Sequence, residues 1–489
     1  MKTYSVAHII PLLQPLSVKG DKDQAFTGIR DNSRQTEAGD LFVAVKGALS
    51  DGHRYIGDAV KRGASVVVAE QEVPDYPGIT VIRVKDSQLA RRQLAQWFYG
   101  RPDRELHITG ITGTNGKTTV ATLLFDLFES LGYPSGLIST VEIRMHDTYL
   151  PASNTTPGIL ELYRLLRQMA DSGIEHVFME ISSHGIDQGR IEGIRFGGGI
   201  FTNLSRDHLD YHKDMTEYRD TKKKFFDMLP EEAFALTNAD DRNGLFMLQN
   251  TRARKKTYAI LRPADYKASI LEQSINGMLM SINGRQFYTP MTGTYNAYNL
   301  TAAYGAAREW GLEPEEILTA LSRLRGAPGR MERITAHDGK TAIVDYAHTP
   351  DALENVLKTL RKILPPGKRI VTVVGAGGNR DKGKRPVMGK TAALLSDWVI
   401  LTSDNPRDED PLQILRDMTE GIPEDQQFKV ITIPDREQAI KTGIMYIEPG
   451  DILLVAGKGH EDYQIIGNEK RHFSDKETIM KYFNSTPNR

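Results

Sequence analysis

The sequence predicts an α/β protein with three domains, each built around a sheet, and three observations support this prediction. A chain of 489 residues is too long for a single hydrophobic core. A glycine-rich loop joins an apolar strand pattern at residues 106–111 to a helical pattern at 120–128. From about residue 329 onward, apolar strands alternate with helical patterns, which indicates a parallel sheet with crossover helices.

The first domain is predicted from two short apolar strands at residues 40–45 and 64–69, with a helix at 52–62 between them. Tyr99–Asp103 reads as a linker, and Pro328–Gly329 marks a second break. These breaks give the predicted domains, which are residues 1–103, 104–328 and 329–489.

The composition is typical of a globular protein of the cytoplasm. Apolar residues make up 39% of the chain, and 62 basic residues nearly balance 63 acidic ones. A net charge of −1 gives no overall field that favours nucleic acid or anionic lipid. The absence of cysteine excludes disulfides and thiolate metal sites. No apolar run approaches membrane-spanning length, and residues 1–11 have too short an apolar core for a signal peptide. We therefore expect a cytoplasmic protein with no nucleic-acid or membrane partner.

The glycine-rich loop of the second domain is the most informative stretch of the chain. Glycine lets the backbone approach a phosphate, free N–H groups at the helix start point at it, and Lys117 adds positive charge. The Thr118 hydroxyl can bind magnesium. Ile111 stands where the usual phosphate-binding loop has its first glycine, and an ordinary glycine-rich turn is the alternative. The predicted nucleotide-binding residues here are Gly113, Thr114, Asn115, Gly116, Lys117, Thr118 and Thr119.

Other polar residues of the second domain follow predicted strands. Glu180 follows the apolar run 177–179, and a carboxylate at a strand end beside a phosphate-binding loop commonly holds magnesium. His208 is either a metal ligand or, with Asp207, a helix cap or surface pair. The run Lys222–Lys224 is typical of a solvated helix face.

Four polar loops of the third domain each follow the carboxyl end of an apolar strand. Open α/β sheets bind ligands at this edge, so four such loops together predict a site, whereas one alone would indicate only a turn. One loop begins at Asp345, and the others span Gly375–Lys382, Ser403–Arg407 and Gly457–Glu461.

These motifs resemble those of the Mur ligases, the ATP-dependent amide-forming enzymes of peptidoglycan precursor synthesis. The similarity extends over nearly the whole chain, and its motifs are the glycine loop, Glu180 with Ser182-Ser183-His184, Asn203–His208, Asn299, Arg330 and Asp345. Three further features look like the MurE type, the tripeptide synthetase: Ser33 followed by Gly39–Ala44, Asn154-Thr155-Thr156, and Asp404-Asn405-Pro406-Arg407. The last motif is similar to that of enzymes that add meso-diaminopimelate rather than L-lysine.

The resemblance implies a uridine-binding N-terminal domain, a central P-loop ATPase domain and a C-terminal Rossmann-like domain that binds an amino acid. It implies ATP and Mg²⁺ as cofactors, and UDP-N-acetylmuramoyl-L-alanyl-D-glutamate and meso-diaminopimelate as substrates of a monomeric enzyme. ATP would phosphorylate the free D-glutamate carboxylate, and an amine of diaminopimelate would attack the acyl phosphate. Phosphorylation suits this chemistry because an ionised carboxylate is a poor electrophile, and the developing charge calls for preorganised donors.

The resemblance also assigns roles to single residues. The expected catalytic residues are Lys117, Lys222 and His208. Thr118 and Glu180 are expected to hold one magnesium, and His208 and carbamylated Lys222 a second. Lys222 is selected from the lysine run because the family places its carbamate four residues after an aromatic like Tyr218. Further nucleotide contacts are expected at Asn299, Arg330 and Asp345. The sugar–dipeptide substrate is expected at Ser33, residues 48–50, Asn154, Thr155, Thr156, Ser182, Gln188 and Arg190.

Diaminopimelate carries a second carboxylate that lysine lacks. Arg407 and Arg380 can offer planar donor pairs to it, so bound lysine would leave a buried guanidinium unpaired, at a cost of about 2–5 kcal/mol. Asp404 and Glu461 would meet the ammonium groups. The alternative for Arg407 is an ion pair with Asp408 or Asp410 on a turn surface. The expected amino-acid site is Arg380, Asp404, Asn405, Pro406, Arg407, Gly457 and Glu461.

Three other functions are compatible with parts of the chain. Folylpolyglutamate synthase has similar chemistry, but it lacks an equivalent of residues 1–103. A P-loop NTPase that moves a partner protein leaves the four loops of the third domain unexplained. A nucleotide-sugar binder without catalysis is disfavoured by the intact set Lys117, Thr118, Glu180 and His208.

Overall fold

A computed structural model of the chain describes residues 3–47, 50–152 and 154–484. Backbone contacts divide the chain into two compact units. The first comprises Met1–Thr109 and Tyr133–Gly197, and the second Gly110–Gly132 and Gly198–Arg489. The division falls inside strand β8 (His107–Thr112), so the units differ from the three predicted domains, whose boundaries stay a prediction.

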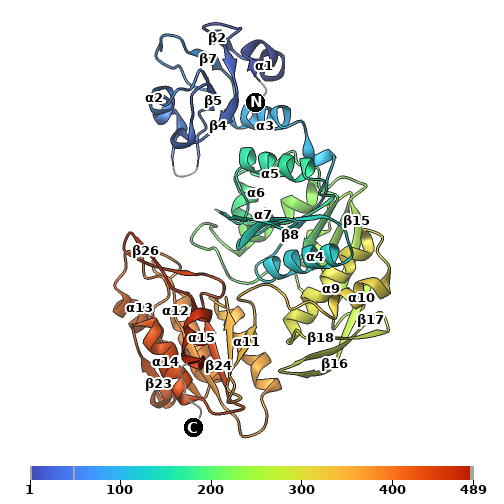
Figure 1. Cartoon of the computed structure of the whole chain (residues 1–489), viewed down its shortest axis with the longest axis vertical. Helices are drawn as coiled ribbons and strands as arrows, with labels where there is room; N and C mark the ends of the chain where they lie inside the picture. The colour runs from blue at the N-terminus through green and yellow to red at the C-terminus, as the bar shows by residue number, and fades with distance from the viewer. Residues whose placement is uncertain (1–2, 48–49, 153, 485–489) are drawn as a thin grey trace. The chain divides into compact units, whose positions relative to one another are not determined.

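The first unit begins with a small α/β sheet, drawn in blue in Figure 1. Strands β4 to β7 pair in parallel, and β2 is antiparallel to β7. The spatial order is β2 (Ser17–Lys19), β7 (Thr80–Arg83), β6 (Val66–Ala69), β5 (Asp40–Val43) and β4 (Gly28–Arg30). The remaining elements are α1 (Val6–Leu13), α2 (Ile56–Lys61), α3 (Ser87–Phe98), the pair β1 (Tyr4–Ser5) and β3 (Ala25–Phe26), and 3₁₀ turns at Ser33–Gln35, Gly52–Tyr55 and Pro102–Arg104.

The helix predicted at residues 52–62 differs from the observed one. Residues Gly52–Tyr55 form a 3₁₀ turn, and only α2 is α-helical. The Asp51 carboxylate explains the tight start, because it accepts both the backbone N–H of His53 and its ring Nδ1–H. Phe42, Val67 and Ile56 pack into the core beneath this segment.

The rest of the first unit is a second sheet with two helices. Strands β9 and β12 pair in parallel, and β10 is antiparallel to both β9 and β11. The spatial order is β11 (Thr148–Pro151), β10 (Glu142–Met145), β9 (Ser135–Ile138) and β12 (His176–Glu180). The helices are α5 (Ile159–Asp171) and α6 (Ser183–Asp187). α3 contacts the α6–β13 connection, because Arg92 pairs with Glu192 and Gln96 donates to the Gly193 carbonyl.

The second unit contains the helix that follows the glycine loop and a sheet that changes from parallel to antiparallel. Strands β13 to β16 pair in parallel, whereas β16, β17 and β18 are antiparallel. The strands are β13 (Gly198–Phe201), β14 (Phe234–Asn238), β15 (Arg254–Ala259), β16 (Tyr266–Ser274), β17 (Gly277–Ile282) and β18 (Arg285–Thr289). The helices are α4 (Lys117–Ser130), α7 (Met215–Asp227), α8 (Gly244–Met247), α9 (Thr294–Glu309) and α10 (Pro314–Leu321).

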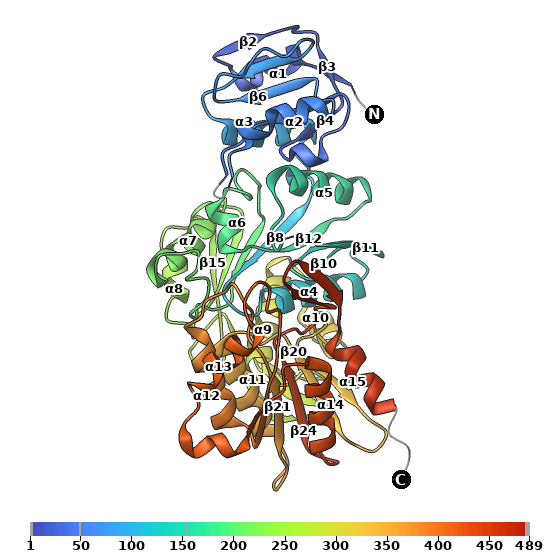
Figure 2. The ribbon, with the colours of Figure 1, turned by 90° about the vertical axis from the view of Figure 1, so that its left-hand side faces the viewer.

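The C-terminal part of the second unit is a six-stranded sheet with helices on both faces (Figure 2). All strands but β19 run parallel. The spatial order is β19 (Glu332–Thr335), β20 (Thr341–Asp345), β24 (Ile452–Ala456), β21 (Ile370–Val374), β22 (Trp398–Leu401) and β23 (Val430–Thr432). One face carries α11 (Pro350–Ile363), α12 (Lys384–Leu395) and α13 (Pro411–Thr419), and the other α14 (Arg436–Tyr446) and α15 (Asp475–Asn484). A 3₁₀ turn (Glu424–Lys429) and the hairpin β25 (Tyr463–Ile466) and β26 (Glu469–His472) complete it.

The strands of this C-terminal sheet read as continuous apolar runs because both faces are covered. Val371 and Leu453 pack against the α14 and α15 face, whereas Ile370 and Leu454 pack against α11 and α12. Because these strands are parallel, the loops that follow them gather at one edge. The predicted parallel sheet with crossover helices is therefore present.

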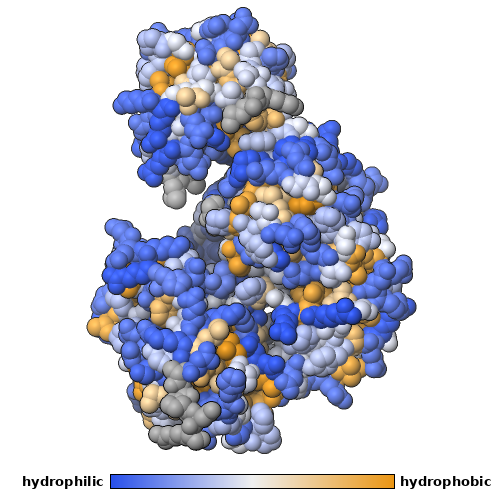
Figure 3. Space-filling view, in the orientation of Figure 1, coloured by the Kyte–Doolittle hydropathy of each residue, from blue (hydrophilic) through white to orange (hydrophobic). Residues whose placement is uncertain are grey.

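Hydrophilic side chains cover most of the face seen in Figure 3, and hydrophobic ones are scattered among them. The large apolar side chains instead fill the cores between helices and sheets. Among the helices of the described residues, none combines the length and the hydropathy that a bilayer crossing requires.

Candidate active site

The loop between β8 and α4 is shaped to hold a phosphate. Gly113 and Gly116 have φ values of +145° and +89°, which residues with a Cβ rarely adopt. A Cβ on Gly113 would lie 2.0 Å from the Thr202 hydroxyl, and one on Gly116 would lie 2.5 Å from Asn299 Oδ1. Because α4 begins at Lys117, the loop presents the free N–H groups and the positive dipole end of that helix to an anion.

The Lys117 side chain lies on the same loop. Its Nζ donates to the carbonyl oxygens of Gly113 at 3.1 Å and Thr114 at 2.8 Å. Thr118 follows it in the first turn of α4, is almost fully buried, and accepts from the Arg330 guanidinium at 3.4 Å. Lysine charge, threonine hydroxyl and backbone donors therefore meet where the sequence predicts a phosphate site.

A cavity of about 570 Å³ opens beside this loop, within the range of small-ligand sites. Its walls include Asn115, Gly116, Thr119, Asn296, Asn299, Arg330 and Asp345. The Asn299 amide donates to Asn296 Oδ1 at 3.3 Å, so the two amides on α9 orient each other. The structure thus brings the loop together with all three of the further residues predicted to bind the nucleotide.

Asp345 ends strand β20 and is buried. It accepts the backbone N–H groups of Met331 at 2.7 Å and Ala347 at 2.8 Å. Burial raises the pKa of Asp345, and the charge of Arg330 and these two N–H groups oppose the rise. The Arg330 guanidinium stacks on the Tyr346 ring at 4.5 Å. These contacts fix the carboxylate and the guanidinium on one side of the cavity.

The segment from Asn203 to His208 supports the glycine loop. Asn203 accepts the Asn115 N–H and donates to the Asn115 carbonyl, each at 3.0 Å. His208 has a left-handed backbone with φ of +54°, and its Nε2 lies 3.6 Å from Asp207 Oδ2. Burial opposes ionisation of Asp207, but His208, His348 and Lys384 hold its pKa below the usual value. The two side chains are therefore close enough to pair, with Asp207 largely buried, and the predicted ligand role of His208 stays a prediction.

Lys222 does not lie on a solvated helix face. It is almost fully buried, its Nζ donates to the Gly113 carbonyl at 2.9 Å, and its ammonium lies 4.6 Å from the centre of the Tyr218 ring. Burial and the nearby Lys117 lower the pKa of Lys222 well below its usual value. Lys223 instead pairs with Asp227 at 2.6 Å, and Lys224 is exposed. The reading of the run as a solvated helix face is wrong for Lys222, which α7 turns toward the loop, and for Lys223, which is buried beside Asp227.

In the first unit, Glu180 ends strand β12 and is buried. Its Oε1 accepts the Thr140 N–H at 2.8 Å and its Oε2 accepts the Thr140 hydroxyl at 3.2 Å. The Thr140 hydroxyl also lies 3.0 Å from the Thr155 hydroxyl. Thr140 therefore orients a predicted magnesium ligand and contacts a predicted substrate residue.

The other predicted dipeptide-binding residues form one network with Glu180. The Thr156 hydroxyl donates to the Glu180 carbonyl and accepts the Ser182 N–H, each at 3.0 Å. Arg190 donates to the Thr156 carbonyl at 2.7 Å and to Gln188 Oε1 at 2.6 Å. Asn154 is exposed. Hydrogen bonds thus join six predicted site residues, with Thr140 as the link between Thr155 and Glu180. The six are Thr155, Thr156, Glu180, Ser182, Gln188 and Arg190.

Two of the predicted uridine residues, Ser33 and Ser50, are among the described residues, and both lie outside the strands. Ser33 is buried in the first 3₁₀ turn, and its carbonyl accepts the Thr36 N–H at 3.3 Å. The Ser50 hydroxyl donates to the Tyr55 hydroxyl at 3.3 Å. Ala48 and Leu49 lie outside the described residues.

In the second unit, Arg407 and Arg380 approach each other over Gly377. A Cβ on Gly377 would lie 3.1 Å from Arg407 Nη1 and 3.7 Å from Arg380 Cγ. Arg407 donates to the Gly378 carbonyl at 2.8 Å, whereas Asp408 accepts from Asn379 and Asp410 pairs with Arg416. The alternative pairing of Arg407 with these two aspartates is therefore absent among the described contacts.

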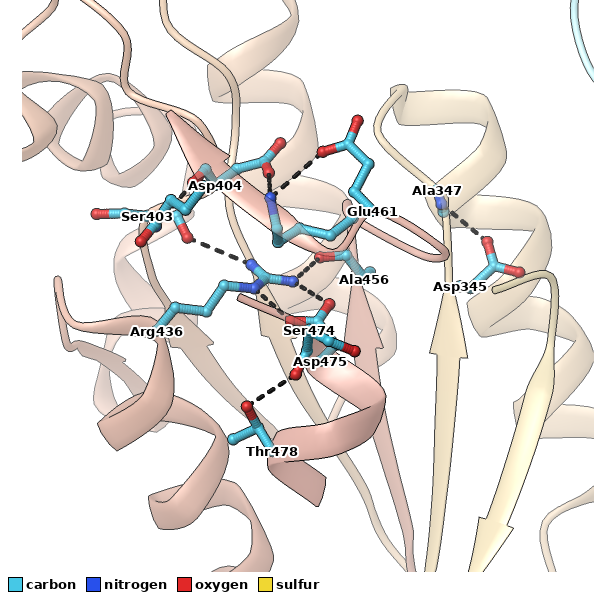
Figure 4. A network of polar contacts seen from close by, with 12 residues as sticks. Asp345, Ala347, Ser403, Asp404, Arg436, Ala456, Glu461, Ser474, Asp475 and Thr478 are labelled. Carbon is cyan, nitrogen blue, oxygen red and sulfur yellow. Dashed lines mark hydrogen bonds and ion pairs between the residues drawn. The ribbon is translucent and has the colours of Figure 1, made fainter. Parts of the chain in front are cut away.

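The loops after β22 and β24 meet through acidic and basic side chains (Figure 4). Lys458 lies 3.5 Å from Asp404 Oδ1 and 3.3 Å from Glu461 Oε2, and its side chain has no exposed surface. Burial and the charge of Asp404 raise the pKa of Glu461, against the effect of Lys458. Asn405 donates to Glu461 Oε2 at 2.9 Å. The predicted amino-acid residues thus form one polar cluster.

Below this cluster, Arg436 joins the two loops. It forms a buried bidentate pair with Asp475 at 2.7 Å for each bond, and donates to the carbonyls of Ala456 at 3.1 Å and Ser403 at 3.4 Å. These carbonyls immediately precede Gly457 and Asp404.

No three carboxylate or imidazole side chains gather as a metal-binding group within the described ranges. Magnesium in nucleotide sites takes one or two protein oxygens and completes its shell with phosphate and water, so hard oxygen donors such as the Thr118 hydroxyl and the Glu180 carboxylate suit it individually.

Three family models match the chain in the order of the segments described above. The Mur ligase family catalytic domain matches residues 25–99, the Mur ligase middle domain 111–307, and the Mur ligase glutamate ligase domain 329–459. The chain is also 50% identical over 478 residues, 97% of its length and 99% of the relative's, to the UDP-N-acetylmuramoyl-L-alanyl-D-glutamate–2,6-diaminopimelate ligase of Bacteroides thetaiotaomicron. The chain belongs to the Mur ligase family.

Further comparisons agree with this assignment. The ligase of the same name from Parabacteroides distasonis is 51% identical over 479 residues, 98% of each chain. A solved structure of a UDP-N-acetylmuramoyl-L-alanyl-D-glutamate–2,6-diaminopimelate ligase superposes with a TM-score of 0.69 at 32% identity, over 99% of each chain. The prediction of a three-domain α/β fold and of membership in the Mur ligase family is confirmed.

Sequence reasoning missed four residues of this Mur ligase that hold predicted site residues in place: Thr140, Asn296, Lys458 and Arg436. Thr140 and Arg436 carry no motif, and their partners Glu180 and Asp475 lie 40 and 39 residues away in the chain. Lys458 stands inside a predicted strand-end loop, and its position there was the one available signal.

Proposed function

We propose that this Mur ligase joins an amino group of meso-diaminopimelate to the free side-chain carboxylate of D-glutamate in UDP-N-acetylmuramoyl-L-alanyl-D-glutamate, using ATP and Mg²⁺. The observation that carries the proposal is the 50% identity, over 97% of the chain, to a ligase named for these two substrates. The phosphate loop, the nucleotide cavity and the cluster of Asp404, Arg407 and Glu461 are the parts that such a reaction needs.

The reaction has two bond-forming steps. The carboxylate oxygen attacks the γ-phosphorus of ATP, which gives an acyl phosphate and releases ADP. The neutral amine then attacks the carbonyl carbon, so that a C–N bond forms while the C–O bond to phosphate breaks. Inorganic phosphate leaves with the electron pair, and the amine loses one proton. Net negative charge on the transferring phosphoryl group is what the site has to stabilise.

The chain's own groups around the phosphate loop suit this task. Lys117 and the first N–H groups of α4 are fixed before the reaction and point positive charge at one place. Magnesium, when bound, neutralises phosphate charge and orients the phosphate oxygens. We assign Thr118, His208 and carbamylated Lys222 of the second unit, and Glu180 of the first, as ligands of two magnesium ions. Asn299, Arg330 and Asp345 hold the nucleoside.

The assignment of Lys222 as a carbamate rests on its chemistry. Only a neutral amine attacks CO₂, and burial together with the nearby charge of Lys117 lowers the pKa of Lys222, which favours its neutral form. Its nitrogen bonds the carbon of CO₂ and loses a proton, which converts the neutral amine into an anionic oxygen donor. Such an oxygen suits the hard Mg²⁺ ion. Lys223 is already paired with Asp227, and Lys224 is exposed, so neither competes for this role.

The remaining substrate contacts are assigned according to the three predicted domains. We propose residues 1–103 as the uridine-binding domain with Ser33, 104–328 as the ATPase domain, and 329–489 as the amino-acid domain, in a monomeric enzyme of the cytoplasm. The muramoyl-dipeptide residues are Asn154, Thr155, Thr156, Ser182, Gln188 and Arg190. The diaminopimelate residues are Arg380, Asp404, Asn405, Pro406, Arg407, Gly457 and Glu461.

A panel of amino acids tests this function. The purified protein is given ATP, Mg²⁺ and the muramoyl-dipeptide, and phosphate release and product mass are measured with meso-diaminopimelate, L-lysine and L-ornithine. We expect phosphate release that requires both acceptor and diaminopimelate, and a product heavier than the acceptor by one diaminopimelate residue. ADP formation at the same rate without the acceptor, with no peptide product, would show an NTPase instead. Turnover with a folate and glutamate would favour folylpolyglutamate synthase.

A further inference from the structure

Lys458 is a buried lysine that the reaction described above does not use. It follows strand β24, and its side chain has no exposed surface. Its Nζ lies 3.5 Å from Asp404 Oδ1, 3.3 Å from Glu461 Oε2 and 3.3 Å from Asn405 Oδ1. Its cationic end therefore touches three of the residues that we assign to diaminopimelate.

Each of the two carboxylates keeps one oxygen for a ligand. Lys458 contacts Oδ1 of Asp404 and Oε2 of Glu461, and Glu461 Oε2 also accepts from Asn405. In the described part of the chain, the other two oxygens, Asp404 Oδ2 and Glu461 Oε1, have no hydrogen-bond partner. In Figure 4 the carboxylates of Asp404 and Glu461 both reach the same lysine nitrogen. A ligand ammonium can therefore share this acidic pair with Lys458.

The charge of Lys458 affects the binding of diaminopimelate more than the binding of L-lysine. The distal end of diaminopimelate carries an ammonium and a carboxylate on the same carbon, so binding the ammonium at Asp404 and Glu461 brings the carboxylate close to two negative groups. Buried like charges repel strongly because little water screens them. The distal end of L-lysine is a bare ammonium, which meets no such repulsion.

We propose that Lys458 is a specificity-determining residue of the amino-acid site. Its ammonium compensates one charge of the Asp404–Glu461 pair, so that the pair holds the distal ammonium of an amino acid without repelling the carboxylate on the same carbon. Arg407 and Arg380, which approach each other over Gly377, then receive that carboxylate. This inference rests on the proposed function, and it adds the selection of a zwitterionic distal end over a bare cation.

Lys458→Met tests the inference, since methionine removes the charge and fills similar space. The kcat/KM values for meso-diaminopimelate and L-lysine are measured with saturating ATP and muramoyl-dipeptide. We expect the value for diaminopimelate to fall about 30-fold or more, while that for L-lysine stays or rises. An equal fall for both amino acids would mean that Lys458 only supports the loop, and would overturn the proposal.

Two variants separate charge from folding. Lys458→Arg keeps the charge, so the preference for diaminopimelate should stay within about threefold of the unmodified enzyme. Lys429→Met removes a lysine at the opposite, amino-terminal edge of the same sheet, where it donates to the Ser396 carbonyl at 2.9 Å. Its preference should not change. A shift in Lys429→Met equal to that in Lys458→Met would overturn the proposal.

The outcomes distinguish this inference from the proposed function. If the unmodified enzyme yields no product with any amino acid, the ligase function is wrong and this inference falls with it. If it uses diaminopimelate but Lys458→Met keeps the same preference, only the role of Lys458 is wrong. If Lys458→Met does not fold by circular dichroism, folded Lys458→Arg decides, and loss of the preference there contradicts the proposal.

Discussion

The buried pair of Arg436 and Asp475 gives a prediction whose size follows from the structure. Both side chains are fully buried, and two bonds of 2.7 Å join them. Asp475→Asn keeps the shape but leaves the guanidinium charge buried without a carboxylate. Breaking one partner of such a pair costs about 3–5 kcal/mol, because the remaining charge is desolvated and uncompensated. For a domain of 150–250 residues this lowers the melting temperature by roughly 6–20 °C.

Tryptophan fluorescence can report on the unfolding of residues 329–489 alone. The chain has three tryptophans, and only Trp398 follows residue 328. Trp97→Phe and Trp310→Phe leave Trp398, in strand β22, as the fluorescent reporter of thermal unfolding. The Asp475→Asn variant is also assayed for its KM for diaminopimelate. We expect this KM to rise, because Arg436 also donates to the carbonyls that precede Asp404 and Gly457.

The double variant Arg436→Met with Asp475→Leu provides the control. It removes both charges, so no ion is left desolvated, and apolar replacement of a buried pair is often close to neutral in stability. We expect it to recover much of the lost melting temperature, but not the KM, since the bonds to the two carbonyls are gone. A melting temperature of Asp475→Asn within about 2 °C of the unmodified protein would refute the desolvation argument, as would a double variant no more stable than the single one.

Three further predictions concern the reaction. Lys117→Met should lower kcat for ADP formation about 100- to 1,000-fold without changing the melting temperature, because one preorganised charge at the phosphoryl group is lost. Arg407→Ala should raise the KM for diaminopimelate about 30- to 4,000-fold and leave the KM for ATP unchanged, and equal effects on both would count against its role. Because burial and the charge of Lys117 lower the pKa of Lys222, its neutral amine is favoured, so ¹³C-bicarbonate should give a carbamate NMR signal. That signal should vanish in Lys222→Met and persist in Lys224→Met.

The parts of the fold and site that could be predicted depend on residues that are close together in the sequence. The glycine loop is recognisable because its glycines, lysine and helix start are consecutive, and the structure shows that Gly113 and Gly116 leave no room for a Cβ. The parallel C-terminal sheet is recognisable because strands covered on both faces form unbroken apolar runs. Its strand-end loops follow from that topology.

The parts that could not be predicted depend on partners distant along the chain. Composition gave Lys222 the appearance of a surface lysine, and only the packing of α7 against Gly113 shows that it is buried. Thr140 meets Glu180 across 40 residues and Lys458 meets Asp404 across 54, and no periodic pattern encodes such pairs. The family resemblance singled out Lys222 as the carbamylated lysine, a role that stays a prediction, and it carried no information on Thr140, Arg436 or Lys458.

The distribution of buried cations in the C-terminal sheet is itself informative. At the edge where the strands end, the charged groups of Arg385, Arg436 and Lys458 are all fully buried. At the opposite edge, Arg369 also pairs with a buried carboxylate, Asp451, but its side chain is 37% exposed.

Buried ion pairs add little net stability, because desolvation offsets most of the attraction, so stability alone does not account for three of them at one edge. Their contacts indicate a different role. Arg385 holds Glu409 and the Gly377 carbonyl, and the strength of this contact lowers the pKa of Glu409 to about 2. Arg436 holds the carbonyls before Asp404 and Gly457. Each cation thus helps to fix a polar loop that follows a strand. Discrimination between diaminopimelate and lysine requires rigid loops. If a loop could relax, the guanidinium that lysine leaves unpaired would become hydrated, and the energetic cost of binding lysine would be lost.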